Sequence, residues 1–252
     1  MKKFVIVGTQ RTGSSALAEA IGSHPRIACG SEWTQLARFL DKIKIAERSL
    51  SEDFSVLTIN HQQQIAAALT PSKQVLGFRR LFRSSDKWLC SPRYSPALWV
   101  DRLEDHLTWL SSRRDIHVVH IVRCDNLAWL TSKALSRETG MFFGQPYPEN
   151  LEVSVDINSS LRRLKSKNWV DTRLKSLEET NPYLRIMYED FRSDNRKHAE
   201  RVISFLGYNP EELPTLHMRA KPQSLKNGKT RILNQELLSS ALDKHGLSDG
   251  SI

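Results

Sequence analysis

The sequence predicts one α/β domain in which helices flank a central, mostly parallel β-sheet. Four short runs of apolar, largely β-branched residues have the length and continuity of strands that are buried on both faces. Between these runs lie segments in which apolar residues recur at helical spacing. The two patterns alternate without a linker or a shift in composition, which predicts a single domain over residues 1–252.

Each expected element follows from one of these patterns. The strand-like runs are residues 3–7, 73–82, 116–122 and 183–191, of which 116–122 is the clearest central strand. The helical segments are residues 14–24, 35–48, 60–69, 101–113, 126–138, 157–180, 198–207 and 234–243. Residues 139–154 are rich in Gly, Pro and aromatic residues, and residues 214–234 are basic; both segments are expected to be irregular.

Composition restricts the class of protein. The 252 residues are 39% hydrophobic and 26% charged, which excludes a disordered or fibrous chain. The longest apolar run, near residues 4–7, is far shorter than the ~20 residues that span a bilayer. A formal net charge of +9 favours an anionic partner. Cys29, Cys90 and Cys124 form no CxxC pair and no signal peptide is recognisable, so we expect a cytoplasmic protein with free thiols.

The segment between the first strand and the first helix is the strongest functional signal. It reads Gly8-Thr9-Gln10-Arg11-Thr12-Gly13-Ser14-Ser15. Two glycines at this spacing, between a buried strand and a helix, form the frame of a phosphate-binding P-loop, GxxxxGK[ST]. Backbone N–H groups and the helix N-terminus bind the anion in such a loop. Ser14 occupies the position of the usual lysine and Arg11 is the loop's only cation, so the loop suits an anion without a magnesium-bound triphosphate.

The loop resembles the 5′-phosphosulfate loop of sulfotransferases that use 3′-phosphoadenosine 5′-phosphosulfate (PAPS), particularly the bacterial and carbohydrate types. This resemblance implies the P-loop-like sulfotransferase fold. It also implies transfer of a sulfuryl group from PAPS, with 3′-phosphoadenosine 5′-phosphate (PAP) as the product and no metal. Arg11 matches the family's basic catalytic position. The expected cradle for the phosphosulfate is formed by Gln10, Arg11, Thr12, Gly13, Ser14 and Ser15.

Two further segments carry the resemblance. The family's second motif is a strand that ends in Arg, followed by a helix that presents Ser, and together they hold the 3′-phosphate. Arg123 and Ser132 match it, with Thr131 as the competing hydroxyl. Residues 188–208 resemble the family's Tyr-Glu-Asp strand and the helix after it. Residues 221–242 resemble a basic C-terminal region that folds over the nucleotide; its candidate ligands are Lys221, Lys226, Lys229 and Arg231.

The resemblance also implies a general base, because many bacterial and carbohydrate-type members use a glutamate shortly after the first helix. Glu32 stands in that position, and His61 and His106 are the alternatives. Arg79 and Trp33 are candidates for contact with the acceptor or the transferred group. The acceptor is expected to be a hydroxyl or amine of a small molecule or glycan. It would bind to insertions around residues 33–112 and 139–158, where the resemblance is weak.

Two other functions fit parts of the sequence. A P-loop nucleotide or nucleoside kinase with a degenerate loop is disfavoured by Ser14 at the lysine position. A non-catalytic polyanion-binding protein would use the positive charge, but the chain has no aromatic RNA-binding motif and its basic residues are spread along the whole sequence. We therefore expect no nucleic-acid partner and no membrane span; the sequence leaves the oligomeric state open.

Overall fold

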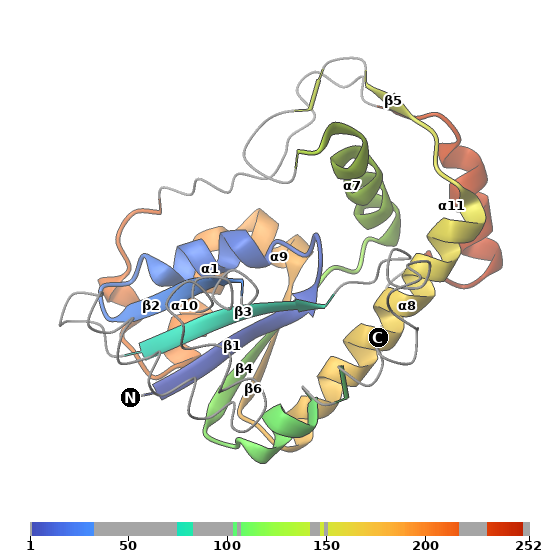
Figure 1. Ribbon diagram of the computed structural model, residues 1–252. Coiled ribbons are helices and arrows are strands. Elements are labelled where there is room, and N and C mark those ends of the chain that lie inside the picture. Colours follow the sequence, from blue (N-terminus) through green and yellow to red (C-terminus); the bar gives the residue numbers. More distant parts are fainter. Residues whose placement is uncertain are drawn as a thin grey trace, which may run out of the picture.

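The fold is built on a five-stranded parallel sheet. The computed structural model describes residues 2–32, 75–82, 103–104, 107–141, 147–148, 151–216 and 231–248 (Figure 1). The strands are β1 (Lys2–Thr9), β2 (Ile27–Glu32), β3 (Val75–Phe82), β4 (Ile116–Val122) and β6 (Tyr183–Met187). Their order is β2-β3-β1-β4-β6, and every pairing is parallel. The predicted α/β class with a central parallel sheet is confirmed.

Helices connect these strands, and a second, two-stranded sheet lies apart from them. The helices are α1 (Ser14–Gly22), α7 (Asn126–Thr139), α8 (Ile157–Lys175), α9 (Tyr188–Ser193), α10 (Asn195–Phe205) and α11 (Gln235–Lys244), with 3-10 turns η1 (Ser176–Glu179) and η2 (Pro210–Glu212). The small parallel sheet pairs β5 (Glu152–Val153) with β7 (Arg231–Ile232). The expected helices at 35–48 and 60–69 lie outside the described residues, whereas that at 101–113 is helical at 103–104 and 107–112.

Both faces of the sheet are covered. Helices α1, α9 and α10 lie on one face and α8 lies on the other (Figure 1). Successive side chains of β1 reach the two layers in turn: Ile6 is buried with the first group of helices, and Val7 is buried against α8. A strand that is buried on both faces needs apolar residues at consecutive positions, which explains the continuous runs that reveal β1 and β4 in the sequence.

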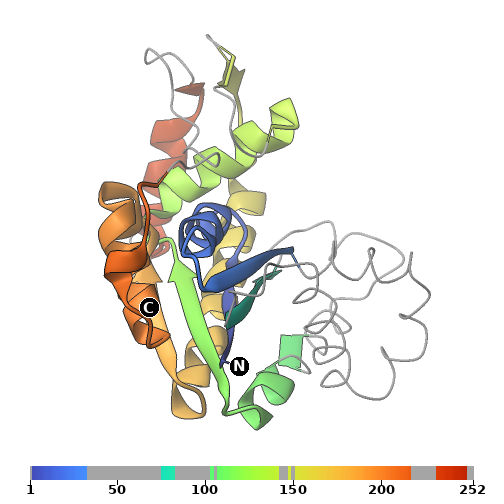
Figure 2. The same ribbon diagram turned by 90° about the vertical axis from the view of Figure 1, so that its left-hand side faces the viewer.

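The C-terminal segment packs against α7 and α8 at the carboxyl end of the sheet (Figure 2). Leu238 and Leu242 of α11 share a buried cluster with Trp129 of α7 and Leu164 of α8. The side-chain amide of Asn126 donates to the carbonyl of Leu247 over 2.8 Å. These contacts hold α7 against α8 and the C-terminal segment.

No helix in the described part of the chain is both long and apolar enough to cross a bilayer.

The strand prediction for residues 183–191 is wrong at its C-terminal end. Strand β6 stops at Met187, whose partner Val122 is the last residue of β4. With no further ladder partner, the chain turns at Tyr188 into α9. The expected helix 157–180 likewise ends early, at Lys175, and continues as the short turn η1.

Strand β2 is absent from the sequence prediction. Its sequence, IACGSE, has one β-branched residue, and Gly30 and Ser31 weaken the strand signal. The strand lies at the edge of the sheet and pairs only with β3, and its register shifts between Cys29 and Glu32. Its neighbour in the sheet, and not its own pattern, therefore determines its conformation.

Candidate functional site

The sheet topology brings the two predicted anion-binding motifs together. From β1 the chain passes to β2 and β3 on one side, and then to β4 and β6 on the other side. The connections therefore leave neighbouring strands β1 and β4 in opposite directions. In open α/β sheets, ligands bind at the carboxyl ends of strands at such a switch point. The loop segment 8–15 begins in the last two residues of β1 and ends in the first two of α1, and Arg123 follows β4.

Both glycines of the loop permit a close approach. A Cβ atom on Gly8 would lie 2.5 Å from the carbonyl oxygen of Ile121 in β4. Gly13 has a φ of 78°, and its Cβ would lie 2.6 Å from the ring of Tyr188. The spacing of the two glycines is therefore required by contact with β4 at one end of the loop and with Tyr188, the first residue of α9, at the other.

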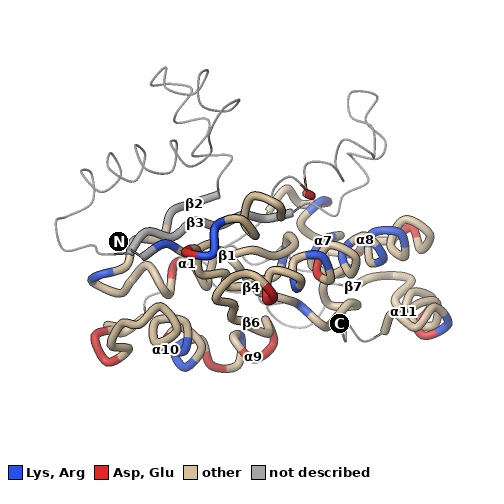
Figure 3. The backbone as a smooth tube through the Cα atoms, turned by 90° about the horizontal axis from the view of Figure 1, so that it is seen from below, with Lys and Arg blue, Asp and Glu red and all other residues tan. Residues whose placement is uncertain are grey.

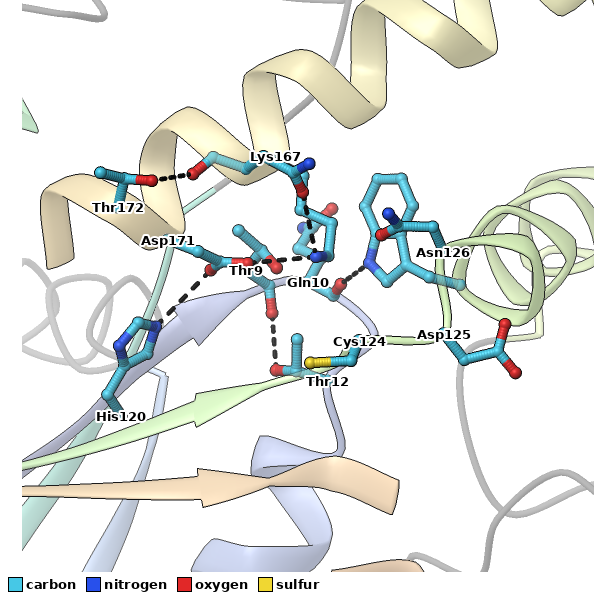
Figure 4. A network of polar contacts seen from close by, with 12 residues as sticks. Thr9, Gln10, Thr12, His120, Cys124, Asp125, Asn126, Lys167, Asp171 and Thr172 are labelled. Atoms are coloured by element: carbon cyan, nitrogen blue, oxygen red, sulfur yellow. Dashed lines mark hydrogen bonds and ion pairs between the residues drawn. The ribbon is translucent and has the colours of Figure 1, made fainter. Parts of the chain in front are cut away.

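Side chains hold three consecutive carbonyl groups of the loop. The hydroxyl of Thr12 donates to the carbonyl of Thr9 over 2.8 Å (Figure 4). The Trp129 indole donates to Gln10 over 2.7 Å, and the Arg123 guanidinium donates to Arg11 over 3.2 Å. A trans peptide directs its C=O and N–H in opposite directions. The N–H groups of these three peptides therefore point away from the three donors, as an anion-binding nest requires.

Backbone conformation adds to this nest. Arg11 has a φ of 67° and is the only non-glycine residue in the described part of the chain with a positive φ. Helix α1 begins at Ser14, and its N-cap is Gly13, which has no side chain to accept from the first N–H groups of the helix. These N–H groups and the positive end of the helix dipole are therefore available for an anion at the loop.

The Arg11 side chain reaches across to α7. Its Nε and Nη2 donate to the hydroxyl of Ser132 over 3.0 and 2.9 Å. Nη2 also donates to the hydroxyl of Tyr147 over 3.4 Å. Burial lowers the pKa of Arg11, while the neighbouring phenols of Tyr147 and Tyr188 oppose that shift. The guanidinium stays charged, because an arginine does not lose its proton in a protein.

Arg123 lies beside Arg11 and is almost fully buried, with 7% of its surface exposed. Its guanidinium carbon lies 4.6 Å from the centre of the Tyr188 ring. Burial lowers the pKa of Arg123, and the charge of Arg11 lowers it further. Its Nε is buried and has no hydrogen-bond partner among the described residues. A buried, unsatisfied donor on a cation is costly unless a ligand supplies the acceptor.

The turn that carries Arg123 is held from α9. The carboxylate of Glu189 accepts from the backbone N–H groups of Cys124 and Asp125 over 3.1 and 3.0 Å. Asp125 in turn caps α7, because its carboxylate accepts from the N–H of Ala128 over 2.7 Å. The buried guanidinium of Arg123, the partly buried one of Arg11, loop N–H groups and hydroxyls thus converge at the carboxyl end of the sheet. This is the composition of a site for a phosphate-like anion.

Comparison with known proteins agrees with this chemistry. A family model described as "Sulfotransferase family" matches residues 3–212. The chain belongs to the sulfotransferase family. A search of curated proteins gives no significant match.

Solved structures similar to this sulfotransferase include the sulfotransferase from Alicyclobacillus acidocaldarius. That similarity has 15% identity and a TM-score of 0.46, and it covers 97% of this chain and 94% of that one. The sulfotransferase domain of the Synechococcus PCC 7002 olefin synthase has 16% identity and a TM-score of 0.45, with 98% and 93% covered. The sulfotransferase domain from the curacin biosynthetic pathway has 12% identity and a TM-score of 0.44, with 98% and 92% covered.

Other expected site residues of the sulfotransferase are placed only by their backbone. Glu32, the last residue of β2, is the register partner of Arg79 in β3. The two expected residues are therefore neighbours in the sheet, although their side chains lie outside what the structure describes. Arg231 lies in β7, and for this residue the structure describes only the backbone. Trp33, His61, His106, Lys221, Lys226 and Lys229 lie outside the described residues.

Three residues of the site were missed by the sequence analysis. Tyr147 lies in a segment expected to be irregular, and no motif marks it. Tyr188 and Glu189 belong to the Tyr-Glu-Asp segment, which the resemblance presents only as a strand. The sequence did carry a signal for Tyr188 and Glu189, because polar residues at the carboxyl end of a buried parallel strand often belong to the ligand site of an α/β sheet.

A buried ionic cluster of the sulfotransferase lies on the α8 side of the sheet, near the start of the loop (Figure 4). Asp171 lies 3.2 Å from the ammonium of Lys167 and 3.6 Å from Nε2 of His120. The other ring nitrogen of His120 lies 2.6 Å from the hydroxyl of Tyr183. All but Tyr183 are at most 1% exposed, so the cluster joins α8 to β4 and β6. In the described chain, no three His, Cys, Asp or Glu residues form a group suited to a metal ion.

Proposed function

We propose that this sulfotransferase transfers a sulfuryl group from PAPS to a hydroxyl or amine of a small-molecule or glycan acceptor. The observation that carries the proposal is the pairing of Arg11 with Arg123, whose Nε is buried and lacks an acceptor among the residues that the structure describes. Two adjacent guanidinium groups at a P-loop nest match a ligand with more than one phosphate-like group. PAPS has such groups at its 3′ and 5′ positions.

Each part of the donor has a group of residues to hold it. The 5′-phosphosulfate would bind the N–H groups of residues 10–15, with hydroxyls from Ser14 and Ser15. Thr12 would contribute its N–H, because its hydroxyl donates to the carbonyl of Thr9. The 3′-phosphate would bind Arg123 and Ser132. The contact of Arg11 with Ser132 favours Ser132 over Thr131 for this role.

The proposed reaction is an in-line displacement at sulfur without a metal. The acceptor oxygen or nitrogen forms a bond to sulfur, and its proton passes to Glu32. The bond from sulfur to the bridging phosphate oxygen breaks, and Arg11 stabilises the charge that develops on that oxygen. Arg79 and Trp33 would contact the acceptor or the transferred group. We place the enzyme in the cytoplasm, because Cys29, Cys90 and Cys124 are odd in number and form no CxxC pair.

Calorimetric titration with PAP, beside ATP plus magnesium, tests the donor. We expect micromolar PAP binding that is lost in Arg123→Ala. Arg162→Ala is the matched control: it removes the same charge from an exposed position on α8 and should bind PAP normally. Binding of ATP but not PAP would contradict the proposal and favour a P-loop kinase with a degenerate loop. With a PAPS-dependent acceptor in hand, Glu32→Gln should bind PAP but transfer no sulfuryl group.

A polyanion-binding role is less well supported. Basic positions are distributed over α8, α10 and α11, and acidic positions accompany them on α10 and α11 (Figure 3). A nucleic-acid surface instead concentrates positive charge on one face. Steeply salt-dependent binding of an oligonucleotide that PAP does not compete would favour that alternative.

A further inference from the structure

We propose that the hydroxyl of Tyr147, which lies beside Arg11 and Ser132, is a further hydrogen-bond donor to the phosphate-like groups of the nucleotide. The inference deepens the proposed function and rests on it. Tyr147 belongs to residues 139–158, one of the two segments expected to bind the acceptor. Its hydroxyl would therefore connect the acceptor side of the enzyme directly to the nucleotide.

The position of the hydroxyl carries the proposal. Its oxygen accepts from Nη2 of Arg11 over 3.4 Å, and the hydroxyl of Ser132 is also a hydrogen-bond partner. A phenol has one hydrogen to donate, and a guanidinium cannot accept it. Ser132 can accept that hydrogen, and a hydroxyl can turn to another acceptor. In the same site, Nε of Arg123 is buried without a partner among the described residues. An incoming phosphate oxygen would satisfy that donor, and for the phenol it is a stronger, charged acceptor than Ser132.

The ring of Tyr147 is held before any ligand binds. Only 6% of the residue is exposed, and it shares a buried cluster with Leu135 of α7, Val153 of β5 and Ile232 of β7. Three separate elements therefore position one hydroxyl at the nest. A donor that is already fixed loses little conformational entropy when the ligand arrives, so each hydrogen bond contributes more of its strength to affinity.

The chemical state of the phenol suits this role. Burial raises the pKa of Tyr147, and the smaller opposing effects of Arg11 and Ser132 do not cancel that shift. The hydroxyl is thus protonated throughout the neutral range and can donate. A group that ionised beside the nucleotide would instead repel its phosphates.

The test compares two tyrosine-to-phenylalanine variants by calorimetric titration with PAP. Tyr147→Phe retains the packed ring and removes the hydroxyl. We expect it to bind PAP about ten- to a hundredfold more weakly, the usual effect of losing one hydrogen bond to a charged group. Tyr183→Phe is the matched control, because it also removes a phenol hydroxyl, which is partly buried and bonded to His120. It should lose stability and keep its affinity for PAP.

Titration with inorganic pyrophosphate separates this inference from the proposed function. If the parent binds pyrophosphate but not PAP, and Tyr147→Phe loses pyrophosphate, the hydroxyl acts on an anion and the PAPS assignment is wrong. If Tyr147→Phe binds PAP as the parent does, the inference is wrong and the proposed function stands. If the parent binds neither compound, both are overturned. Thermal unfolding of both variants shows that each is folded.

Discussion

Glu189 contributes to the anion site without being one of its donors. Its carboxylate accepts from the N–H groups of the two residues that follow Arg123. That contact determines the path of the turn, and hence where the guanidinium of Arg123 lies over the Tyr188 ring. A hydrogen bond to a charged acceptor is stronger than one to a neutral acceptor, so the negative charge itself matters here.

Glu189→Gln tests this role by replacing the carboxylate with a neutral group of the same shape. Both N–H groups donate to Oε1, whose place the amide oxygen can take, but the variant loses the negative charge and the second acceptor, Oε2, which the N–H of Cys124 also approaches over 3.3 Å. We expect a loss of about 1–3 kcal/mol in the free energy of unfolding in urea, together with weaker binding of PAP. Glu179→Gln, at an exposed position in η1, is the control and should change neither quantity. Unchanged stability in Glu189→Gln would contradict the assigned role.

A site residue could be predicted from the sequence where it belongs to a short contiguous motif. Arg11 and the loop around it are contiguous in sequence, and Arg123 and Ser132 lie on one strand–helix unit. The structure brings Arg11 and Ser132 into contact, but the roles of all these residues remain predictions. Tyr147 is 136 positions from Arg11. Only the packing of α7, β5 and β7 brings the two together, and no local pattern reports that packing.

At the scale of elements, the loop is defined by what its glycines touch. Gly13 and Gly140 both have a positive φ, of 78° and 67°. A Cβ on Gly13 would collide with Tyr188, whereas a Cβ on Gly140 would meet nothing within 4 Å. The two positions therefore share a conformational cost but differ in steric cost.

The alanine variants at these two positions separate those costs. Gly140→Ala should lose about 1–2 kcal/mol of stability, which is the cost of a left-handed alanine. Gly13→Ala should lose clearly more and should also lose PAP binding, because the loop has to move away from α9. Urea unfolding and calorimetry measure the two effects. Equal losses of stability in the two variants would mean that Tyr188 does not constrain the loop.

Elements with strong local patterns were predicted well. The expected strand 116–122 has the bounds of β4, and the expected helix 126–138 is one residue shorter than α7. Strands β5 and β7 have two residues each and pair across a large sequence separation. A two-residue strand has no periodicity to detect. Just beyond the two strands, the side-chain amide of Asn234 bonds both the N–H and the carbonyl of Val155 and so extends the pairing.

At the scale of the whole molecule, the cluster of Lys167, Asp171 and His120 joins the two layers behind the loop. Removing one charge from a buried pair leaves the other uncompensated, which typically costs about 3–5 kcal/mol. We therefore expect Asp171→Asn to be severely destabilised in urea. The double variant Lys167→Met, Asp171→Leu should be more stable than Asp171→Asn, because no buried charge remains unpaired. The reverse order would contradict the assignment of the loss to an uncompensated buried charge.

Alkaline pH should destabilise the fold through its buried phenols. Burial raises the pKa values of Tyr147 and Tyr183, whereas both phenols titrate near about 10 in the unfolded chain. Their contribution to stability is complete below that pH and is lost as the pH rises through the folded-state values, because the unfolded state loses its protons first. Urea unfolding between about pH 8 and 11 should show a smaller decline for Tyr183→Phe than for the parent. Equal slopes would contradict the assignment.

At Arg11, the left-handed backbone conformation lowers the stability of the fold, whereas the guanidinium is needed for the proposed activity. A glycine there would relieve about 1–2 kcal/mol of conformational strain and would remove the guanidinium that the proposed reaction requires. A laboratory selection for heat resistance alone should therefore enrich Arg11→Gly, and a selection for turnover should eliminate it. The strained arginine would then persist in nature only where the chemistry is under selection, and lineages that have lost the activity should drift toward glycine at this position.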